Sequence, residues 1–251
     1  MRKTVLIDSF DCYLPPRLAD YAIVAVDVVR ATTTAITAAA VGRRCFVVPS
    51  LISAFELAKA VRNPLLGGEQ LGVVPSGFHI DNSPSALLGR VDIDRPLILL
   101  SSSGTRLCHE AAKFDVALIA CLRNYPAVGA YLQRFDKVVI FGAASRGEFR
   151  EEDQICCARI AYQLFKFDYS PANAATSDIV KRWRKQPVTS WLCGKSAAYL
   201  RRIGQFADLN FIVDHVGDLS SVFMLRGAEV VDTGTIGTPP SLATAVMRLG
   251  Q

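Results

Sequence analysis

The chain has 251 residues, of which 51% are hydrophobic and 20% are charged, and its formal net charge is +5. This composition is typical of a folded globular protein and excludes a disordered or fibrous chain, and the length fits one large α/β domain or two smaller lobes. No apolar stretch approaches the roughly 18 to 20 residues that span a bilayer, and the first apolar run, Val5 to Ile7, is too short for a signal peptide. We therefore expect a cytoplasmic protein without a membrane partner.

The charge of the chain indicates the kind of ligand it binds, and its cysteines indicate whether it holds zinc or disulfides. The densest basic run holds Lys181, Arg182, Arg184 and Lys185 around Trp183, and a solvated helix face explains such a run better than a nucleic-acid surface does. The modest positive charge suits a small anion, and we expect no nucleic-acid partner. The seven cysteines contain no C-x-x-C pair, so neither a zinc site nor a disulfide framework is indicated. The composition leaves a homo-oligomer open.

Short apolar runs alternate with helix-like segments through most of the chain. Runs of this kind are typical of buried parallel strands, and the alternation builds a sheet with covering helices. The predicted fold class is α/β, with a largely parallel or mixed sheet. The predicted strands are Ala22 to Val26, Cys45 to Val48, Leu97 to Leu100, Val116 to Ala120 and Lys137 to Phe141, and the predicted helices are Thr32 to Val41, Leu51 to Arg62, Thr105 to Lys113, Tyr125 to Phe135 and Glu151 to Phe167.

Two regions differ from this alternation. Glycine, proline and serine recur from Gly67 to Arg90, which predicts a long functional loop. The chain is more basic and helical from Tyr169 to Leu200, and strand-like runs follow at 209–213, 221–225 and 229–231, the last two forming a hairpin around Arg226-Gly227. We predict a lobe at 1–170 that carries most of the site, followed at 171–251 by a smaller α/β lobe or a C-terminal extension packed on it. The boundary is expected near 169–174, and two such lobes would hold the site between them.

The first candidate site follows the strand Ala22 to Val26. Asp27 stands at the strand end, and Arg30 and Thr32 to Thr34 lead into a helix. A helix start offers unpaired N–H groups, threonine hydroxyls add donors, and an arginine can grip two phosphate oxygens, while Asp27 suits a cation. The alternative is that Thr32 caps the helix and Asp27 is an ordinary turn residue.

A second strand end repeats this pattern. Leu97 to Leu100 runs into Ser101, Ser102 and Ser103, followed by Gly104-Thr105-Arg106 and a helix. Hydroxyls, a glycine that lets backbone approach a ligand, and an arginine one turn into the helix form an anion cradle. Capping by Ser103 explains only part of the cluster. Because parallel strands bring their carboxyl ends to one edge, we expect the two turns to lie together.

The third strand end supplies negative charge. Lys137 to Phe141 is followed by Ser145-Arg146-Gly147 and then by Glu148, Glu151, Glu152 and Asp153. Acidic residues in a first helical turn complement the helix dipole, which explains one or two of them. The remainder suit Mg²⁺, which takes hard oxygen ligands and needs only one or two carboxylates besides water and phosphate oxygens.

The glycine-rich loop adds Glu69, between Gly67-Gly68 and Gly72, as a metal ligand or base. Asn82 and Ser83 are candidate donors to phosphate oxygens, the alternative being a turn in which Asn82 bonds its own backbone. His79 is a weaker candidate for an acid. Gly194-Lys195-Ser196 resembles a phosphate loop, but position 189 is Thr instead of the required glycine, so we interpret it as a loop and helix start.

Taken in order, several of these motifs resemble the 2-phosphosulfolactate phosphatase family. The resemblance extends to Ser196 to Gly204, Asp208 and Arg226-Gly227, so that it covers nearly the whole chain. Its most specific part is the first motif, Val26 to Thr34. The motifs are Val26-Asp27-Val-Val-Arg30-Ala-Thr-Thr-Thr34, Gly67-Gly68-Glu69, Asn82-Ser83-Pro84, Gly104-Thr105-Arg106 and Glu152-Asp153.

The resemblance implies an α/β, magnesium-dependent phosphomonoesterase, and members of that family release phosphate from 2-phospho-3-sulfolactate on the route to coenzyme M. Gln70 stands where the family commonly has arginine, and Ser103 stands where an asparagine is expected before Gly104. One cation that binds an anion is thereby missing, and Arg30, Arg106 or Arg146 are the residues that would compensate.

The resulting hypothesis is a phosphatase acting on a small phosphorylated 2-hydroxy acid. Charge stabilisation and alignment supply most of the rate in phosphoryl transfer. The alternatives are an anion-binding protein that has lost turnover, suggested by Gln70, and a nucleic-acid binder. The predicted catalytic residues are Asp27, Arg30 and Glu69; the predicted Mg²⁺ ligands are Asp27, Glu69, Glu152 and Asp153; and the predicted substrate-binding residues are Thr32, Thr33, Thr34, Asn82, Ser83, Ser102, Ser103, Gly104, Thr105, Arg106 and Arg146.

Overall fold

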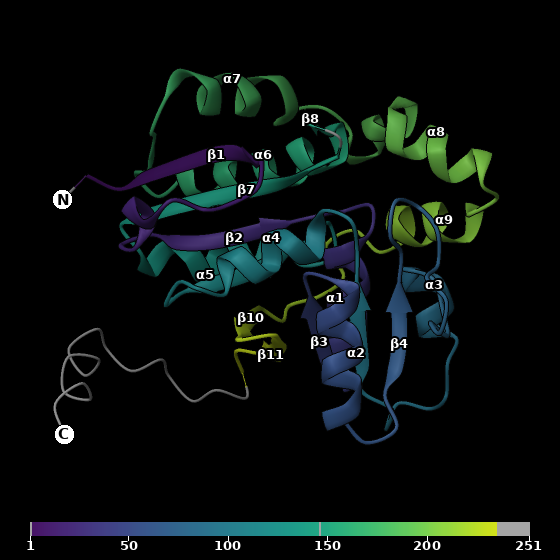
Figure 1. Cartoon of the computed structure of the whole chain (residues 1–251). Helices are drawn as coiled ribbons and strands as arrows, with labels where there is room; N and C mark the ends of the chain where they lie inside the picture. Colours follow the sequence, from purple (N-terminus) through teal and green to yellow (C-terminus); the bar gives the residue numbers. More distant parts are fainter. Residues whose placement is uncertain (1, 146, 235–251) are drawn as a thin grey trace, which may run out of the picture.

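The computed structural model describes residues 2–145 and 147–234, and its strands form one mixed sheet of 11 strands (Figure 1). The strand order is β4-β5-β3-β11-β10-β6-β2-β7-β1-β9, and β8 pairs with β7. The strands are β1 (Thr4–Phe10), β2 (Ala22–Val26), β3 (Cys45–Val48), β4 (Leu65–Gly68), β5 (Leu97–Leu100), β6 (Ala117–Ala120), β7 (Lys137–Ser145), β8 (Glu148–Phe149), β9 (Ser170–Pro171), β10 (Phe223–Arg226) and β11 (Glu229–Asp232).

The sheet consists of two parallel blocks joined by an antiparallel hairpin. Strands β4, β5 and β3 are mutually parallel, and so are β6, β2, β7, β1 and β9. The hairpin β10–β11 pairs antiparallel with β6 on one side and with β3 on the other. Figure 1 shows the two blocks running in clearly different directions, as expected of a strongly twisted sheet. The mixed α/β fold predicted from the sequence is confirmed.

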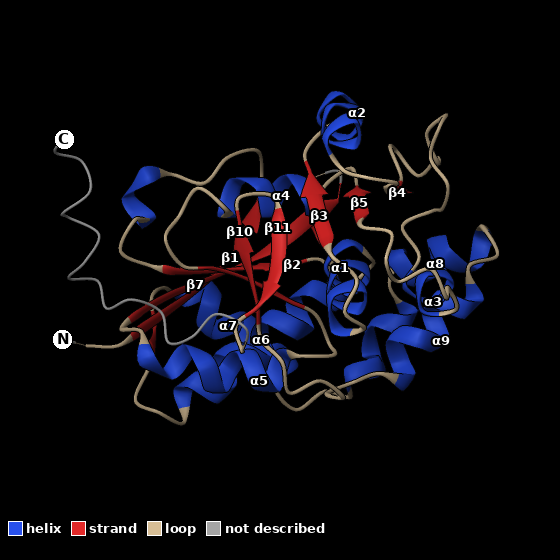
Figure 2. Ribbon diagram, turned by 90° about the horizontal axis from the view of Figure 1, so that it is seen from below, coloured by secondary structure: helices blue, strands red, loops and turns tan. Residues whose placement is uncertain are grey.

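Helices cover both faces of the sheet (Figure 2). α1 and α4 lie between the blocks, because their apolar side chains share one core cluster with residues of β2, β6 and β7 and of β3, β4 and β5. α5, α6 and α7 pack on the other face of the second block, and α2 packs on the far face of the first. The helices are α1 (Ala31–Ala40), α2 (Leu51–Ala60), α3 (Pro84–Leu88), α4 (Gly104–Ala111), α5 (Tyr125–Tyr131), α6 (Glu151–Phe165), α7 (Ala174–Trp183), α8 (Lys195–Arg202) and α9 (Phe206–Asp214), with 3-10 turns at Pro16–Leu18, Leu132–Arg134 and Val188–Cys193.

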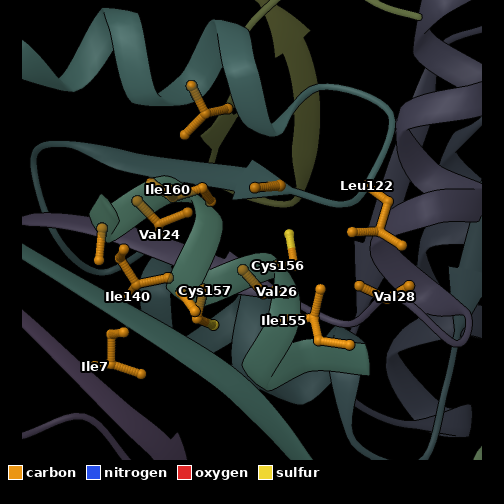
Figure 3. Close-up of a cluster of buried hydrophobic side chains, with 14 of the residues drawn as sticks. Ile7, Val24, Val26, Val28, Leu122, Ile140, Ile155, Cys156, Cys157 and Ile160 are labelled. Atoms are coloured by element: carbon orange, nitrogen blue, oxygen red, sulfur yellow. The ribbon is translucent and has the colours of Figure 1, made fainter. Parts of the chain in front are cut away.

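The long helix α6 holds the largest core cluster together. In Figure 3, Ile155, Cys156 and Ile160 of this helix lie in one cluster with strand residues such as Val24 and Ile140. Burying apolar side chains of this size stabilises the fold by roughly 1.5 to 3 kcal/mol each. Burial also raises the pKa of the Cys156 thiol well above its ordinary value, so it stays neutral and packs as a small hydrophobe. The start of α6 is thereby fixed relative to the ends of β2 and β7.

The structure confirms the predicted strands and helices with small shifts at their ends, and it confirms the hairpin. The strand predicted at 209–213 is wrong: these residues belong to α9, where Leu209, Phe211 and Ile212 form one buried helical face. β1 was missed, and the predicted loop at 67–90 includes the end of β4 and α3. The division at 169–174 stays a prediction, and β10 and β11, which follow it, pair with strands that precede it.

The basic run on α7 does not present an aromatic ring for base stacking. Trp183 is buried, and its Nε1 donates to Gln154 Oε1 at 2.9 Å. Lys181 forms an ion pair with Asp178. Across residues 2–145 and 147–234, no helix is both long and apolar enough to cross a membrane.

Candidate active site

A cavity of about 690 Å³ opens at the carboxyl ends of strands from both blocks of the sheet. Asp27 follows β2, Glu69 follows β4, the serines at 101–103 follow β5, and Ala143 lies near the end of β7. The strand ends that the sequence placed together therefore do converge. The polar and charged lining residues are Asp27, Arg30, Glu69, Asn82, Ser101, Ser102, Ser103, Ser145, Arg150, Glu152, Asp153, Lys195, Ser196, Tyr199 and Arg202.

The turn after β2 lies directly against the start of α4. A Cβ atom at Gly104 would overlap Asp27 Oδ2 and crowd the Cβ of Ala31. The sequence predicted that this glycine allows the backbone to approach a ligand. In the structure the glycine allows the backbone to approach the Asp27 side chain instead. The two anion-cradle motifs become one continuous wall of the cavity.

The threonine hydroxyls of this turn are used within the fold. Thr32 Oγ1 accepts a hydrogen bond from the Asp27 amide at 2.9 Å and donates to Ala120 O at 2.7 Å. Thr33 and Thr34 donate to the carbonyls of Val28 and Arg30. All three side chains are buried, which agrees with the turn-stabilising alternative. Their role as substrate ligands stays a prediction.

The serine turn after β5 divides its hydroxyls between structure and cavity. Ser101 and Thr105 cap each other, because Thr105 Oγ1 accepts from the Ser101 amide and Ser101 Oγ accepts from the Thr105 amide. Ser102 and Ser103 line the cavity. Arg106 is exposed on α4 and is not part of the cavity wall. Arg146 lies outside the described residues.

Three buried carboxyl groups lie together in the cavity wall. Asp27, Glu152 and Asp153 are 8%, 2% and 3% exposed. Burial raises the pKa of Asp27 to about 7 against the effect of the Ala31 amide, and the charges of Glu69 and Glu152 add to the rise. Burial raises the pKa of Glu152 to about 7, and burial together with the charges of Glu152 and Asp27 raises that of Asp153. The three carboxyl groups therefore favour their protonated forms unless a cation neutralises them.

The donor set of this cluster fits a hard divalent cation. Glu152 Oε2 is buried without a hydrogen-bond partner, and so is Asn82 Oδ1 elsewhere in the lining of the same cavity. Buried polar atoms seldom lack a partner. No three His, Cys, Asp or Glu side chains converge as a ready chelate among the described residues, but Mg²⁺ takes only one or two carboxylates besides water and phosphate oxygens.

Glu69 differs from these three because its oxygens are satisfied. Its Oε1 accepts from the Ser102 amide at 2.7 Å, and its Oε2 accepts from Ser102 Oγ and from the Gly72 amide. The side chain therefore ties the glycine-rich loop to the turn after β5. Its predicted roles as metal ligand or base stay predictions.

Two carboxylates hold Arg30 in place, and neither was predicted from the sequence to be its partner. Its Nη1 donates to Asp208 Oδ2 at 2.5 Å and its Nη2 donates to Asp81 Oδ2 at 2.9 Å. Burial lowers the pKa of Arg30, but Asp81 and Asp208 outweigh this effect and raise it. Since both terminal nitrogens already bind carboxylates, Arg30 is a compensated cation in the cavity wall.

Asp208 also fixes the turn that carries the remaining predicted donors. Its Oδ1 accepts from Ser83 Oγ at 2.7 Å and from the amide of Ser85 at 3.1 Å. Ser83 caps α3 and does not line the cavity, whereas Asn82 does. His79 Nδ1 accepts from the Leu66 amide, so its ring is a structural element of the loop.

Comparison with known proteins identifies the family. The sequence pattern of the family described as 2-phosphosulpholactate phosphatase matches residues 13–226. The chain belongs to this family. A probable 2-phosphosulfolactate phosphatase of Symbiobacterium thermophilum is 41% identical over 154 residues, 59% of this chain and 66% of that protein. One of Pseudothermotoga lettingae is 35% identical over 61% of this chain and 66% of that protein, and one of Clostridium tetani is 31% identical over 82% and 90%. The chain thus spans just under two thirds of the first two relatives.

Gln70 and Ser103, the two positions at which we predicted departures from the family pattern, lie in different places. Gln70 is exposed and outside the cavity wall, and its backbone pairs with that of Val73. Ser103 lines the cavity. A departure at position 103 would therefore change the wall itself, whereas one at position 70 would leave the wall intact.

Several wall residues of this family member were missed by the sequence reading. They are Arg150, just before α6, and a group on α8. The available signal was the spacing of Lys195, Ala198, Tyr199 and Arg202, which places them on one helical face. Spacing alone does not say whether such a face meets a cavity or solvent.

Proposed function

We propose that this protein is a magnesium-dependent phosphatase that hydrolyses 2-phospho-3-sulfolactate or a closely related phosphorylated 2-hydroxy acid. Family membership supports the phosphatase activity, and the relatives named as probable 2-phosphosulfolactate phosphatases support the substrate. One observation carries the proposal. A single cavity brings together three buried carboxyl groups, the serine turn after β5 and Ser145 at the end of β7. Free cysteines throughout the chain support a cytoplasmic setting.

The proposed metal ligands are Asp27, Glu152 and Asp153, with Asn82 beside them. When bound, Mg²⁺ would neutralise the phosphoryl oxygens and act as a Lewis acid. The protein groups hold these ligands in place: the Val28 amide donates to Asp153 Oδ1 at 2.8 Å, and Ser196 lowers the pKa of Glu152 against the larger effect of burial. Hydrogen bonds to outer partners of this kind orient metal ligands and are costly to remove.

The serine turn after β5 is placed to hold the phosphoryl group. Ser102 and Ser103 lie in the cavity at the end of that strand and at the start of α4, and helix starts are common binding places for phosphate. Water attacks phosphorus, the P–O bond of the ester breaks, and the released oxygen gains a proton as the 2-hydroxyl group. Because the carboxylate cluster repels a phosphate dianion, turnover requires the cation.

An assay of phosphate release tests the proposal. The purified protein should release phosphate from 2-phospho-3-sulfolactate in Mg²⁺ and lose this activity in a chelator. Asp27→Asn and Glu152→Gln should each lower kcat/KM by at least about 100-fold, because each removes a proposed ligand of the cation that positions the phosphoryl group.

Glu151→Gln is the matched control. Glu151 stands next to Glu152 in the same helical turn but does not line the cavity, so its variant should stay within about threefold of wild type. Tight phosphate binding without turnover in the wild type would favour the alternative of a binding protein. Full activity in Asp27→Asn and Glu152→Gln would refute the site.

A further inference from the structure

One face of α8 forms a wall of the cavity. Lys195, Ala198, Tyr199 and Arg202 recur at i, i+3, i+4 and i+7, and all four line the cavity. The opposite face buries Ala197 in the core. The helix is therefore held by its apolar side and presents two cations, with a tyrosine between them, to whatever the cavity binds.

The cations of this wall have fewer carboxylate partners than Arg30, which has two. Lys195 shares a single carboxylate, that of Glu148, with Arg150. Arg202 lies over the Tyr199 ring, 5.4 Å from its centroid, and makes no ion pair among the described residues. Two cations thus face the cavity from α8, and no carboxylate on that helix offsets them.

The wall also lies close to the proposed reaction centre. Ser196, next to Lys195, lines the same cavity as Glu152 and lowers the pKa of that carboxyl group. Tyr199 donates through its hydroxyl to Gly72 O, and the Gly72 amide donates to Glu69. Helix α8 therefore connects the carboxylate cluster to the glycine-rich loop, and its cations continue the cavity beyond the metal ligands.

We propose that Arg202 and Lys195 recognise the second strong acid group of the substrate, the sulfonate in 2-phospho-3-sulfolactate. Arg30 cannot serve this purpose with its full charge, because Asp81 and Asp208 already hold it. A compact substrate whose phosphoryl group lies at the carboxylate cluster presents its sulfonate to α8. Charge-assisted hydrogen bonds to guanidinium and ammonium groups are well suited to an anion that never protonates near neutral pH.

The inference rests on the proposed function, and a pair of substrates separates the two. 2-Phospholactate has the phosphate and carboxylate of 2-phospho-3-sulfolactate but carries a hydrogen in place of the sulfonate. Arg202→Ala should raise KM for 2-phospho-3-sulfolactate about 10-fold with a much smaller change in kcat. The ratio of kcat/KM values for the two substrates should fall about 10-fold, and Lys195→Ala should act in the same direction.

A binding measurement gives an independent readout. Titration calorimetry with 3-sulfolactate should show about 10-fold weaker binding to Arg202→Ala than to wild type, and the difference should shrink at high ionic strength. Arg202→Lys should recover part of the discrimination, because it keeps the charge.

Arg201→Ala is the matched control. Arg201 is the neighbouring exposed arginine of α8, but it donates to Leu192 O and does not line the cavity. Its variant should keep both the ratio and the affinity. If wild type hydrolyses neither substrate, the proposed function fails. If wild type is active but Arg202→Ala leaves the ratio unchanged, or lowers both activities equally, the assignment of Arg202 is wrong.

Discussion

Two charged clusters contribute to the cavity wall, the first of them only through Arg30, and they are built in opposite ways. Arg30, Asp81 and Asp208 form a paired network in which each carboxylate also accepts hydrogen bonds from neighbouring polar groups. Asp27, Glu152 and Asp153 form an unpaired cluster, which contains a buried oxygen without a partner. The first cluster is complete within the protein, whereas the second leaves negative charge for something else to neutralise.

The difference separates residues that position from residues that react. Burial of unpaired charge costs free energy, and proteins keep such charge mainly at functional sites. The charges of the paired network bind one another and so hold together three segments that are distant in sequence, at Arg30, Asp81 and Asp208. Breaking the two clusters should therefore have opposite effects on the stability of the fold.

The largest effect is expected from the paired network. Asp208→Ala should lower the free energy of unfolding by about 3 to 5 kcal/mol, because it leaves Arg30 partly uncompensated in a buried site and removes the acceptor of Ser83 and Ser85. Urea unfolding monitored by circular dichroism measures this change.

Asp178→Ala is the control for that measurement. Asp178 pairs with Lys181 at 3.6 Å on the exposed face of α7, and an exposed pair contributes about 1 kcal/mol at most. An equal loss in both variants would mean that the Arg30 network is no more important than a surface pair.

The unpaired cluster should make stability depend on pH. The native pKa of Asp27 and of Glu152 is raised to about 7, above the unfolded values of about 4. Between these limits the native state holds protons that the unfolded state has released, so the free energy of unfolding falls as pH rises from about 4 to about 7. Each such proton contributes a slope of about 1.4 kcal/mol per pH unit.

Urea unfolding of chelator-treated protein at several pH values tests this dependence. Glu152→Gln should flatten the slope and should be as stable as wild type, or more so, above pH 7, because one of the repelling charges is gone. A slope that is the same in wild type and Glu152→Gln would contradict the assignment of this pH dependence to the cluster.

Magnesium should offset the same repulsion. A cation that binds only the native state at 100 times its dissociation constant adds about 2.7 kcal/mol of stability. The shift of the wild-type unfolding midpoint with Mg²⁺ at pH 7.5 measures it. Glu151→Gln should keep the shift, whereas Asp153→Asn should lose most of it; a shift preserved in Asp153→Asn would exclude Asp153 as a ligand.

The same contrast explains how far the sequence alone leads. Strands buried on both faces, such as Ala22–Val26, have continuous apolar runs and were predicted. Strand β1 was missed because Asp8 and Ser9 interrupt its pattern. The unpaired carboxylates were predicted because strand ends and helix starts lie at one edge of a sheet, which is a property of local order along the chain.

The paired network needs contacts that the sequence does not reveal. Arg30 and Asp208 are 178 positions apart, and nothing in the local pattern predicts that they meet. Arg106 and Arg202 are both helix arginines, yet the first is exposed away from the cavity and the second lines it. Only the packing of α4 and α8 distinguishes them.

The smallest expected effect concerns Glu69, a carboxylate paired with neutral donors instead of a cation. Ser102 Oγ donates to Glu69 Oε2 at 2.8 Å and accepts from the Leu71 amide at 2.7 Å. Ser102→Ala should lower the free energy of unfolding by about 1 kcal/mol, the net contribution of hydrogen bonds whose partners water can reach. Ser103→Ala should change stability less, because the Ser103 hydroxyl bonds no other group within the described chain. A loss of 3 kcal/mol or more in Ser102→Ala would place Glu69 with the paired network, as a carboxylate on which the fold itself depends.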